Sequence, residues 1–174
     1  DIESDRSIFF APSGSNWMNT KIYDYNTDTW ETDGANLEVG TYFSWSTASY
    51  DIESDKVIFV KYSGNAYATV YAYDYNTNTW EEKESAGPGI DEYWGTSAYD
   101  PISDRVILIE DNGNNFSTVR AFDYNTNTWE ERNYLQGTDP YWGILVNRTE
   151  LEYVGGYSGP TWHVSTSGSN DNDG

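Results

Sequence analysis

Cysteine is absent from this chain of 174 residues, and histidine occurs once. The missing thiols exclude disulfides and thiolate-bound metals, so redox chemistry says nothing about the compartment. The single histidine, His163, leaves no histidine cluster for zinc or copper. A Ser-His-Asp triad would have to use this residue close to the C-terminus. We therefore expect no catalytic triad and no metal centre built on cysteine and histidine.

Basic residues and long apolar runs are also scarce. Lys and Arg number 9 against 29 Asp and Glu, which gives a formal net charge of -20 at pH 7. This charge argues against nucleic acid and anionic membranes as partners, and it leaves cations, basic proteins and neutral sugars. No apolar run approaches the roughly 18–20 residues that a membrane-spanning helix needs, so no membrane insertion is expected. The chain begins at Asp1 without a signal peptide, which predicts a processed N-terminus, and its polar composition predicts a secreted or cell-surface protein.

A seven-residue motif, Asp-Tyr-Asn-Thr-Asn/Asp-Thr-Trp, occurs three times. Its copies end at Trp30, Trp80 and Trp129, with spacings of 50 and 49 residues. A period of this length indicates a repeat architecture, in which each unit buries its apolar face only against a neighbour. The chain carries 16 Tyr, 8 Trp and 6 Phe, and this aromatic content argues against disorder.

Each repeat contains four short segments with the character of a strand. In the second repeat, an apolar run at 57–60 follows an Asp…Ser-Asp turn, an alternating segment spans 69–73, and a third strand starts at Trp80. After a connection rich in Gly and Pro, the fourth strand is expected at 44–50, 93–99 and 141–146. Four strands in about 49 residues, without helical periodicity, predict an all-β fold made of the four-stranded antiparallel blades of a β-propeller.

These features resemble the kelch family of propeller repeats. The resemblance rests on Tyr73-Asp74…Asn78-Thr79-Trp80 with its counterparts ending at Trp30 and Trp129, and on the apolar strand after each Ser-Asp turn. It covers residues 1–165 and implies one antiparallel blade of four strands per repeat. The double glycine of kelch repeats is missing from the three full copies, and Gly155-Gly156 in the last, partial copy resembles it.

The repeats give about three and a half blades. We expect a repeat domain at 1–165, with blades at 1–43, 44–92, 93–140 and a partial one at 141–165, followed by a flexible polar tail at 166–174. The first repeat starts in the turn after its first strand, so it is expected to lack that strand. Propellers usually close with roughly four to eight blades, and open sheet edges invite pairing. The missing neighbours are expected from a longer propeller, from other copies in a ring or filament, or from a four-bladed ring within one chain.

Two tryptophans recur at fixed positions in the repeat. An aromatic residue with the period of the blade is expected to pack between adjacent blades, where it buries a large area. The candidates for interblade packing are Trp30, Trp80, Trp129, Trp45, Trp94 and Trp142.

The aspartate-rich turns admit two interpretations. Asp74, Asn76 and Asn78 resemble the first half of a calcium loop, but Thr79 and Ser85 stand where that loop requires Gly and Glu. We expect instead turns in which the side chains of Asp and Asn bond nearby backbone N–H groups. The paired carboxylates of the Asp…Ser-Asp turns are expected to shape hairpins rather than to act as catalytic acids. No catalytic residue, metal ligand or cofactor is predicted, and weak calcium binding by surface carboxylates stays open.

Two further sets of residues are candidates for modification or binding. Asn115 and Asn147 stand in sequons for N-glycosylation. The connections that differ between repeats are the expected binding loops, because function on a repeating scaffold usually lies in its variable loops. Their candidate residues are Asp91, Glu92, Tyr93, Asp139 and Tyr141.

The function favoured by these observations is that of a non-catalytic extracellular structural subunit. Strand complementation between copies would complete a ring or a filament. The first alternative is a glycan- or protein-binding module that uses the variable loops. The second is a propeller glycosidase, which requires two carboxylates that converge in a central pocket.

Overall fold

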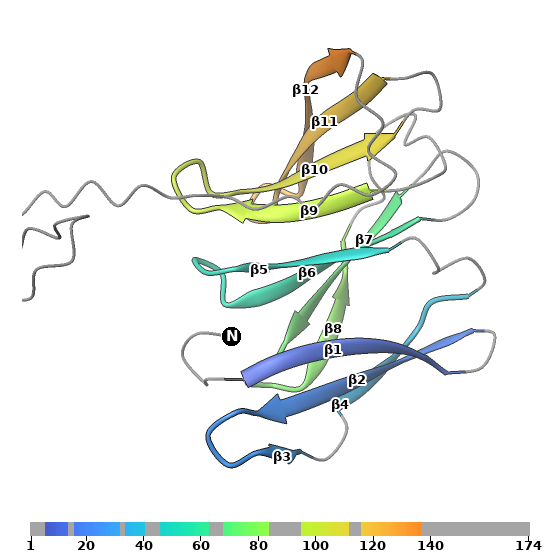
Figure 1. Ribbon diagram of the computed structural model, residues 1–174, viewed down its shortest axis with the longest axis vertical. Coiled ribbons are helices and arrows are strands. Elements are labelled where there is room, and N and C mark those ends of the chain that lie inside the picture. Colours follow the sequence, from blue (N-terminus) through green and yellow to red (C-terminus); the bar gives the residue numbers. More distant parts are fainter. Residues whose placement is uncertain are drawn as a thin grey trace, which may run out of the picture.

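Three four-stranded antiparallel sheets follow one another along the chain (Figure 1). The computed structural model describes residues 6–13, 16–31, 34–40, 46–62, 68–83, 95–111 and 116–136. Within these ranges there is no helix of the length and apolarity that a bilayer crossing demands. The expected all-β fold of propeller-like blades is confirmed, with one described sheet for each of the three repeats.

The first sheet contains β1 (Arg6–Ser13), β2 (Trp17–Asp24), β3 (Thr29–Trp30) and β4 (Gly34–Glu38). The strand β2 pairs with β1 on one side and with both β3 and β4 on the other. Among the described residues, β1 pairs with β2 alone.

The other two sheets have four strands in sequence order. Those of the second sheet are β5 (Thr47–Asp51), β6 (Lys56–Tyr62), β7 (Ala68–Asp74) and β8 (Thr79–Glu82). Those of the third are β9 (Gly95–Asp100), β10 (Arg105–Asp111), β11 (Phe116–Asp123) and β12 (Thr128–Gln136). By repeat position, β1 corresponds to β6 and β10, so the described first sheet has no counterpart of β5 or β9.

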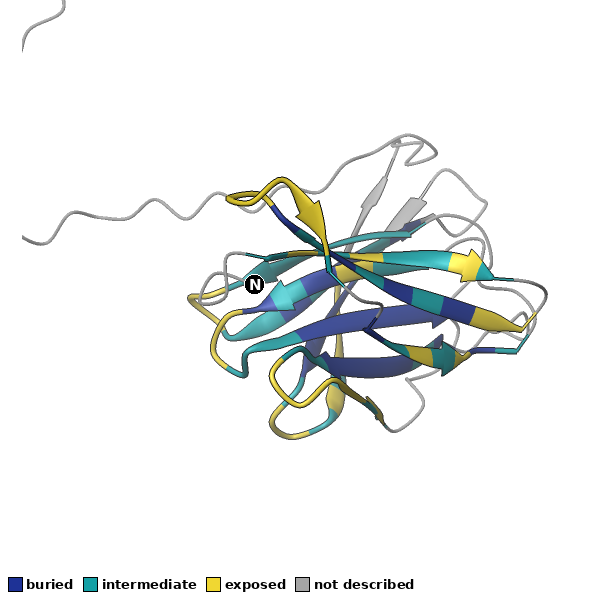
Figure 2. Ribbon diagram, turned by 90° about the horizontal axis from the view of Figure 1, so that it is seen from below, coloured by how far each residue is buried: buried dark blue, intermediate teal, exposed yellow. Residues whose placement is uncertain are grey.

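The second sheet forms the centre of the core because it lies between the other two (Figure 1). Figure 2 shows the buried residues along the strands in dark blue. The apolar run 57–60 in β6 is buried along its whole length. This explains why it lacks the alternation of apolar and polar residues that is found in a sheet with one solvent-exposed face. Its side chains join two clusters. One of them, which includes Ile58 and Val70, meets Leu108 and Phe122 of the third sheet, and the other holds Phe59 and Tyr71 with Met18 of the first sheet.

The motif turns are built from local hydrogen bonds to aspartate. The Asp74 Oδ1 atom accepts a bond of 3.1 Å from the Thr77 N–H, and Asp24 and Asp123 accept equivalent bonds. The last Asx residue of each turn is in the left-handed region, with φ of 53° at Asn78. The expected turn structure is confirmed. In the described ranges, no group of three or more His, Cys, Asp or Glu side chains is arranged to hold a metal.

The Asp…Ser-Asp turns likewise shape hairpins. Tyr50 donates a hydrogen bond of 2.6 Å from its hydroxyl to Asp55, and Tyr99 donates one of 2.9 Å to Asp104. Both aspartates have a φ of 53°, a conformation that Asp and Asn tolerate better than most residues. The carboxylates therefore fix the entry into β6 and β10.

One ion pair also repeats in every sheet. A cation at the start of the β1, β6 or β10 strand meets the aspartate that ends the next strand, and the Lys56–Asp74 distance is 3.2 Å. The equivalent pairs are Arg6–Asp24 and Arg105–Asp123. Burial alone would raise the pKa of Asp74, but hydrogen bonds from Thr77 and Lys56 outweigh it and lower this pKa. The pKa values of the two counterparts are lowered in the same way.

The lowered pKa values predict a loss of stability in acid. These carboxyl groups release their protons more readily in the folded chain, so their contribution is complete above the unfolded pKa of about 4 and is lost as the pH falls through the folded-state values. Urea unfolding should show a falling midpoint below about pH 4. Asp74→Asn should lower the midpoint at neutral pH and reduce its fall in acid, whereas Glu38→Gln, at an exposed position, should change neither. A midpoint for Asp74→Asn that matches the parent chain at neutral pH would contradict this role.

The packing between the second and third sheets predicts a large effect of Phe122→Ala. Phe122 is fully buried, and removing its ring should cost about 3–5 kcal/mol of the free energy of unfolding. Ile102→Ala is the control, since that side chain is 81% exposed and its loss should cost less than about 0.5 kcal/mol. Chemical denaturation measures both, and similar small effects for the two variants would rule out this core.

Candidate functional site

Trp80 lies between the first two sheets. Its ring is 5.0 Å from that of Phe10 in β1 and 5.0 Å from that of Tyr73 in its own sheet. Its Nε1–H donates a hydrogen bond of 2.7 Å to the carbonyl oxygen of Ala35 in β4. One side chain thus joins the sheets by apolar area and by a directed bond.

The counterparts of Trp80 have different surroundings. The ring of Trp129 lies 5.1 Å from that of Phe122 at a tilt of 46°, and it packs against the cluster shared by the second and third sheets. Trp30 contacts Phe9 and Tyr23 of its own sheet and is 61% exposed. It does not lie between two described sheets, because none covers this face of the first sheet.

The remaining predicted site residues lie outside the described ranges. They are Trp45, Trp94, Trp142, Asn115, Asn147, Asp91, Glu92, Tyr93, Asp139 and Tyr141.

In the second and third sheets, a tyrosine contacts a glutamate of the preceding sheet. The Tyr75 hydroxyl donates a bond of 3.0 Å to Glu31, and the Tyr124 hydroxyl donates one of 3.1 Å to Glu81. The Lys83 Nζ atom lies 3.8 Å from the centre of the Tyr124 ring. Burial and the bond to Glu81 raise the pKa of Tyr124 to about 12, so its hydroxyl stays protonated and donates at neutral pH.

This contact between sheets is a feature of the site that the sequence interpretation missed. The tyrosine is the second residue of the repeated motif and the glutamate follows the motif tryptophan, so both recur in all three copies. Their recurrence was a usable signal, but spacing alone does not reveal that the partners come from neighbouring repeats.

The free face of the first sheet exposes the residues that its neighbours bury. Phe9 is 50% exposed, Tyr25 77% and Trp30 61%. The counterparts in the second sheet, buried or half-buried, are Phe59, Tyr75 and Trp80. The repeat position is the same, so the difference comes from the neighbouring sheet alone.

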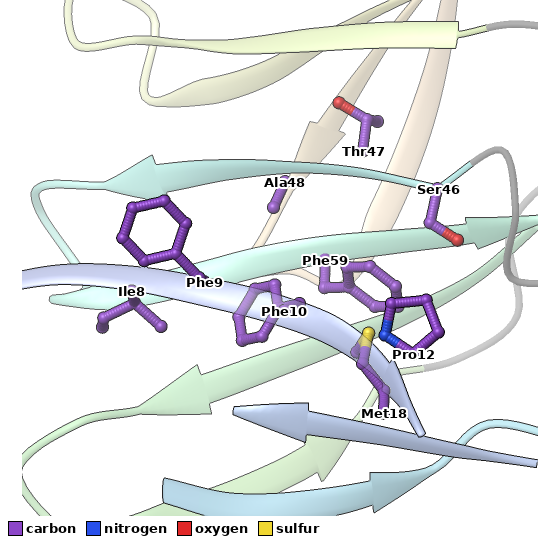
Figure 3. A pocket seen from close by; sticks show the side chains of 9 residues that line it. All are labelled: Ile8, Phe9, Phe10, Pro12, Met18, Ser46, Thr47, Ala48 and Phe59. Carbon is purple, nitrogen blue, oxygen red and sulfur yellow. The ribbon is translucent and has the colours of Figure 1, made fainter. Parts of the chain in front are cut away.

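A cavity of about 270 Å³ opens between β1 and β5 (Figure 3). Its lining is largely apolar and includes Phe10, Met18 and Phe59, while Thr47 and Ala48 line it from β5. The cavity therefore lies beside the edge of β1 that pairs with no strand among the described residues.

The contact between β5 and β9 shows what occupies the equivalent space one repeat later. There the Ser97 hydroxyl lies 2.9 Å from that of Thr47 and accepts a bond of 2.6 Å from that of Ser49. Because Ala48 occupies the repeat position of Ser97, the cavity marks the place where another inner strand would contact β5.

Comparisons with known proteins show a similarity of fold. No protein-family model matches the chain, and no curated protein matches it. Among solved structures, the crystal structure of TolB from Acinetobacter baumannii matches with a TM-score of 0.50 and 15% sequence identity. The match covers 74% of this chain and 29% of that chain, so the chain spans less than a third of the TolB structure. At this identity the likeness shows a β-propeller-like fold and nothing of function.

The tyrosine–glutamate contacts predict a stabilising role for one hydroxyl group. Tyr124→Phe keeps the ring under Lys83 but removes the bond to Glu81, and it should cost about 1 kcal/mol of the free energy of unfolding. Tyr25→Phe is the matched control, because its hydroxyl meets no preceding sheet in the described chain, and it should have no effect in dilute protein. Equal urea midpoints for the two variants would show that the intersheet bond contributes nothing.

Proposed function

We propose that this chain is a non-catalytic, kelch-like propeller subunit that associates with further copies of itself in the extracellular space. The observation that carries this proposal is the exposed aromatic face of the first sheet. Burial of a side chain such as Phe9 or Trp30 contributes about 1.5–3 kcal/mol when it is complete. The second sheet shows that the same repeat positions pack well when another sheet is present.

The edge of β1 supplies a second, directed part of the interface. An unpaired edge presents a row of N–H and C=O groups to any strand of suitable register. The cavity next to it is lined mainly by apolar side chains, so the added strand should present apolar residues toward β5.

The segment 141–146 of another copy fits this requirement by its repeat position. Aligned on its Trp-Gly pair with 94–95, it places Ile144 and Val146 where β5 has Thr47 and Ser49. In the observed contact, Thr47 and Ser49 meet the hydroxyl of Ser97. In the proposed contact, Ile144 and Val146 meet the methyl group of Ala48. The hydroxyl-bearing side chains of the observed contact are thus replaced by apolar ones on both strands.

Net charge opposes this assembly. A charge of -20 on every copy makes approach unfavourable over distances of a Debye length, which is about 10 Å at 0.1 M salt. The proposal therefore requires local apolar and hydrogen-bonded contacts whose favourable free energy exceeds this repulsion. It also predicts that added salt strengthens association.

Sedimentation velocity over a range of protein concentrations tests the proposal. The mass should rise above the 19.8 kDa of one chain, and added salt should strengthen association because it screens repulsion. Ile144→Asp should weaken association by placing a charge against the apolar cavity, whereas Ser167→Asp, with the same charge in the C-terminal segment, should have little effect. A single species of 19.8 kDa at every concentration and salt level would refute self-association.

A further inference from the structure

The contact made by Tyr124 defines a seat on the second sheet. Glu81 accepts the hydrogen bond of the tyrosine, and Lys83 lies over its ring while it forms an ion pair of 3.0 Å with Glu81. Glu81 lies in β8, and Lys83 comes two residues later, directly after the end of this strand. We call this Glu–x–cation pair the tyrosine seat.

The third sheet carries a second tyrosine seat at the same repeat position. Glu130 and Arg132 occupy the positions of Glu81 and Lys83, and they form an ion pair of 2.7 Å. The pair is therefore already oriented in the single chain. An arginine suits this role as well as a lysine does, because its planar group also stacks on aromatic rings.

The two seats differ in the exposure of their basic side chains. The Lys83 side chain, which contacts the Tyr124 ring, is 11% exposed, whereas the Arg132 side chain is 55% exposed. Within the residues that the structure describes, no tyrosine lies in the seat formed by Glu130 and Arg132.

Tyr25 is the matching ligand at the other end of the described chain. It is the counterpart of Tyr75 and Tyr124 in the first repeat, and its side chain is 77% exposed. It projects from the motif turn of the sheet whose aromatic face is free. The first sheet thus offers the tyrosine, and the third sheet offers the seat.

A single chain does not bring these two groups together. The second sheet lies between the first and the third (Figure 1). Closed propellers usually have roughly four to eight blades, so the three described sheets are too few to form a ring, whereas the described parts of two copies provide six. Two head-to-tail contacts related by a twofold axis would close such a ring.

We propose that two copies of this chain form a closed ring of six sheets, in which Tyr25 of each copy occupies the Glu130–Arg132 seat of the other. This inference rests on the proposed self-association and adds its stoichiometry and its contact residues. Each ring contains two such seats. The face that carries Phe9 and Trp30 then packs against the outer face of the partner's third sheet, where Ile107 and Ile109 are half-buried in the single chain.

Cross-linking tests the seat directly, because the chain has no cysteine of its own. The double variant Tyr25→Cys/Glu130→Cys is treated with a short bis-maleimide under native conditions. The double variant Glu31→Cys/Tyr75→Cys calibrates the reagent, since these positions face each other within one chain and should give an internal link. The expected product of the first variant is a species of two copies, joined at both seats.

Other products have distinct meanings. Cross-linked products of three, four and more copies would overturn the two-copy ring and would indicate a filament instead. An assembly that sediments as an oligomer but does not cross-link, although the calibration variant does, would overturn the seat and leave self-association intact. A parent chain, without substitutions, that stays monomeric at every concentration would overturn both proposals.

A pair of charge-matched substitutions provides a second test. Glu130→Ala and Glu38→Ala each remove one negative charge from an exposed position, so a general reduction of repulsion would strengthen association equally in both. The seat predicts instead that Glu130→Ala weakens association by about tenfold per seat, or about a hundredfold for a ring with two seats. Equal dissociation constants for the two variants, measured by sedimentation equilibrium with unchanged circular dichroism, would overturn the seat.

Discussion

Burial of both faces of each sheet is the constraint on which the rest of this structure depends. A blade of four short strands is too small to bury its own apolar side chains, so neighbouring blades must cover them. The second sheet satisfies this condition, since Ile58 contacts the third sheet while Phe59 lies toward the first. Within the part of the chain that the structure describes, the first sheet satisfies it on one face only. The exposed aromatic residues of this chain are thus explained by position in the array.

Polar contacts give the array its geometry. Apolar packing between sheets is weakly directional, whereas the bonds of Trp80 to Ala35 and of Tyr124 to Glu81 each require one relative position of two sheets. The tyrosine and the glutamate recur in every repeat, so that contact is encoded at each junction, whereas the Nε1 atom of Trp129 has no hydrogen-bond partner among the described residues. In the proposed assembly, the first sheet of one copy would meet the third sheet of another through the same tyrosine and glutamate positions.

Much of the fold could be predicted from the sequence, because its signals are local. The apolar run 57–60, the Asx turn at Asp74 and the repeat period depend on a few adjacent residues each, and the structure places strands and turns there. The division of the outer strand of the first sheet into β3 and β4 was not foreseen, since pairing and not composition decides it.

Contacts between sheets could be predicted only in part. Recurrence identified the tryptophans, but the exposure of Trp30 depends on a neighbour that the sequence does not show. In the third sheet, Glu110 and Arg120 stand at the repeat positions of Lys61 and Tyr71 and form a buried pair at 3.3 Å. The two charges offset each other, and Arg120 also lies 3.4 Å from Glu131, so single-residue preferences could not have placed them in the core.

Hydrogen exchange of the β1 amide groups tests most directly whether the sheets of this chain must be covered by another copy. An unpaired edge strand leaves alternate N–H groups open to water, whereas the equivalent strand β6 is paired on both sides. The account predicts that, in concentrated protein, all amides of Arg6–Ser13 are protected nearly as well as those of Lys56–Tyr62, and that dilution exposes the alternate ones. Fast exchange of those alternate amides at every concentration would contradict it.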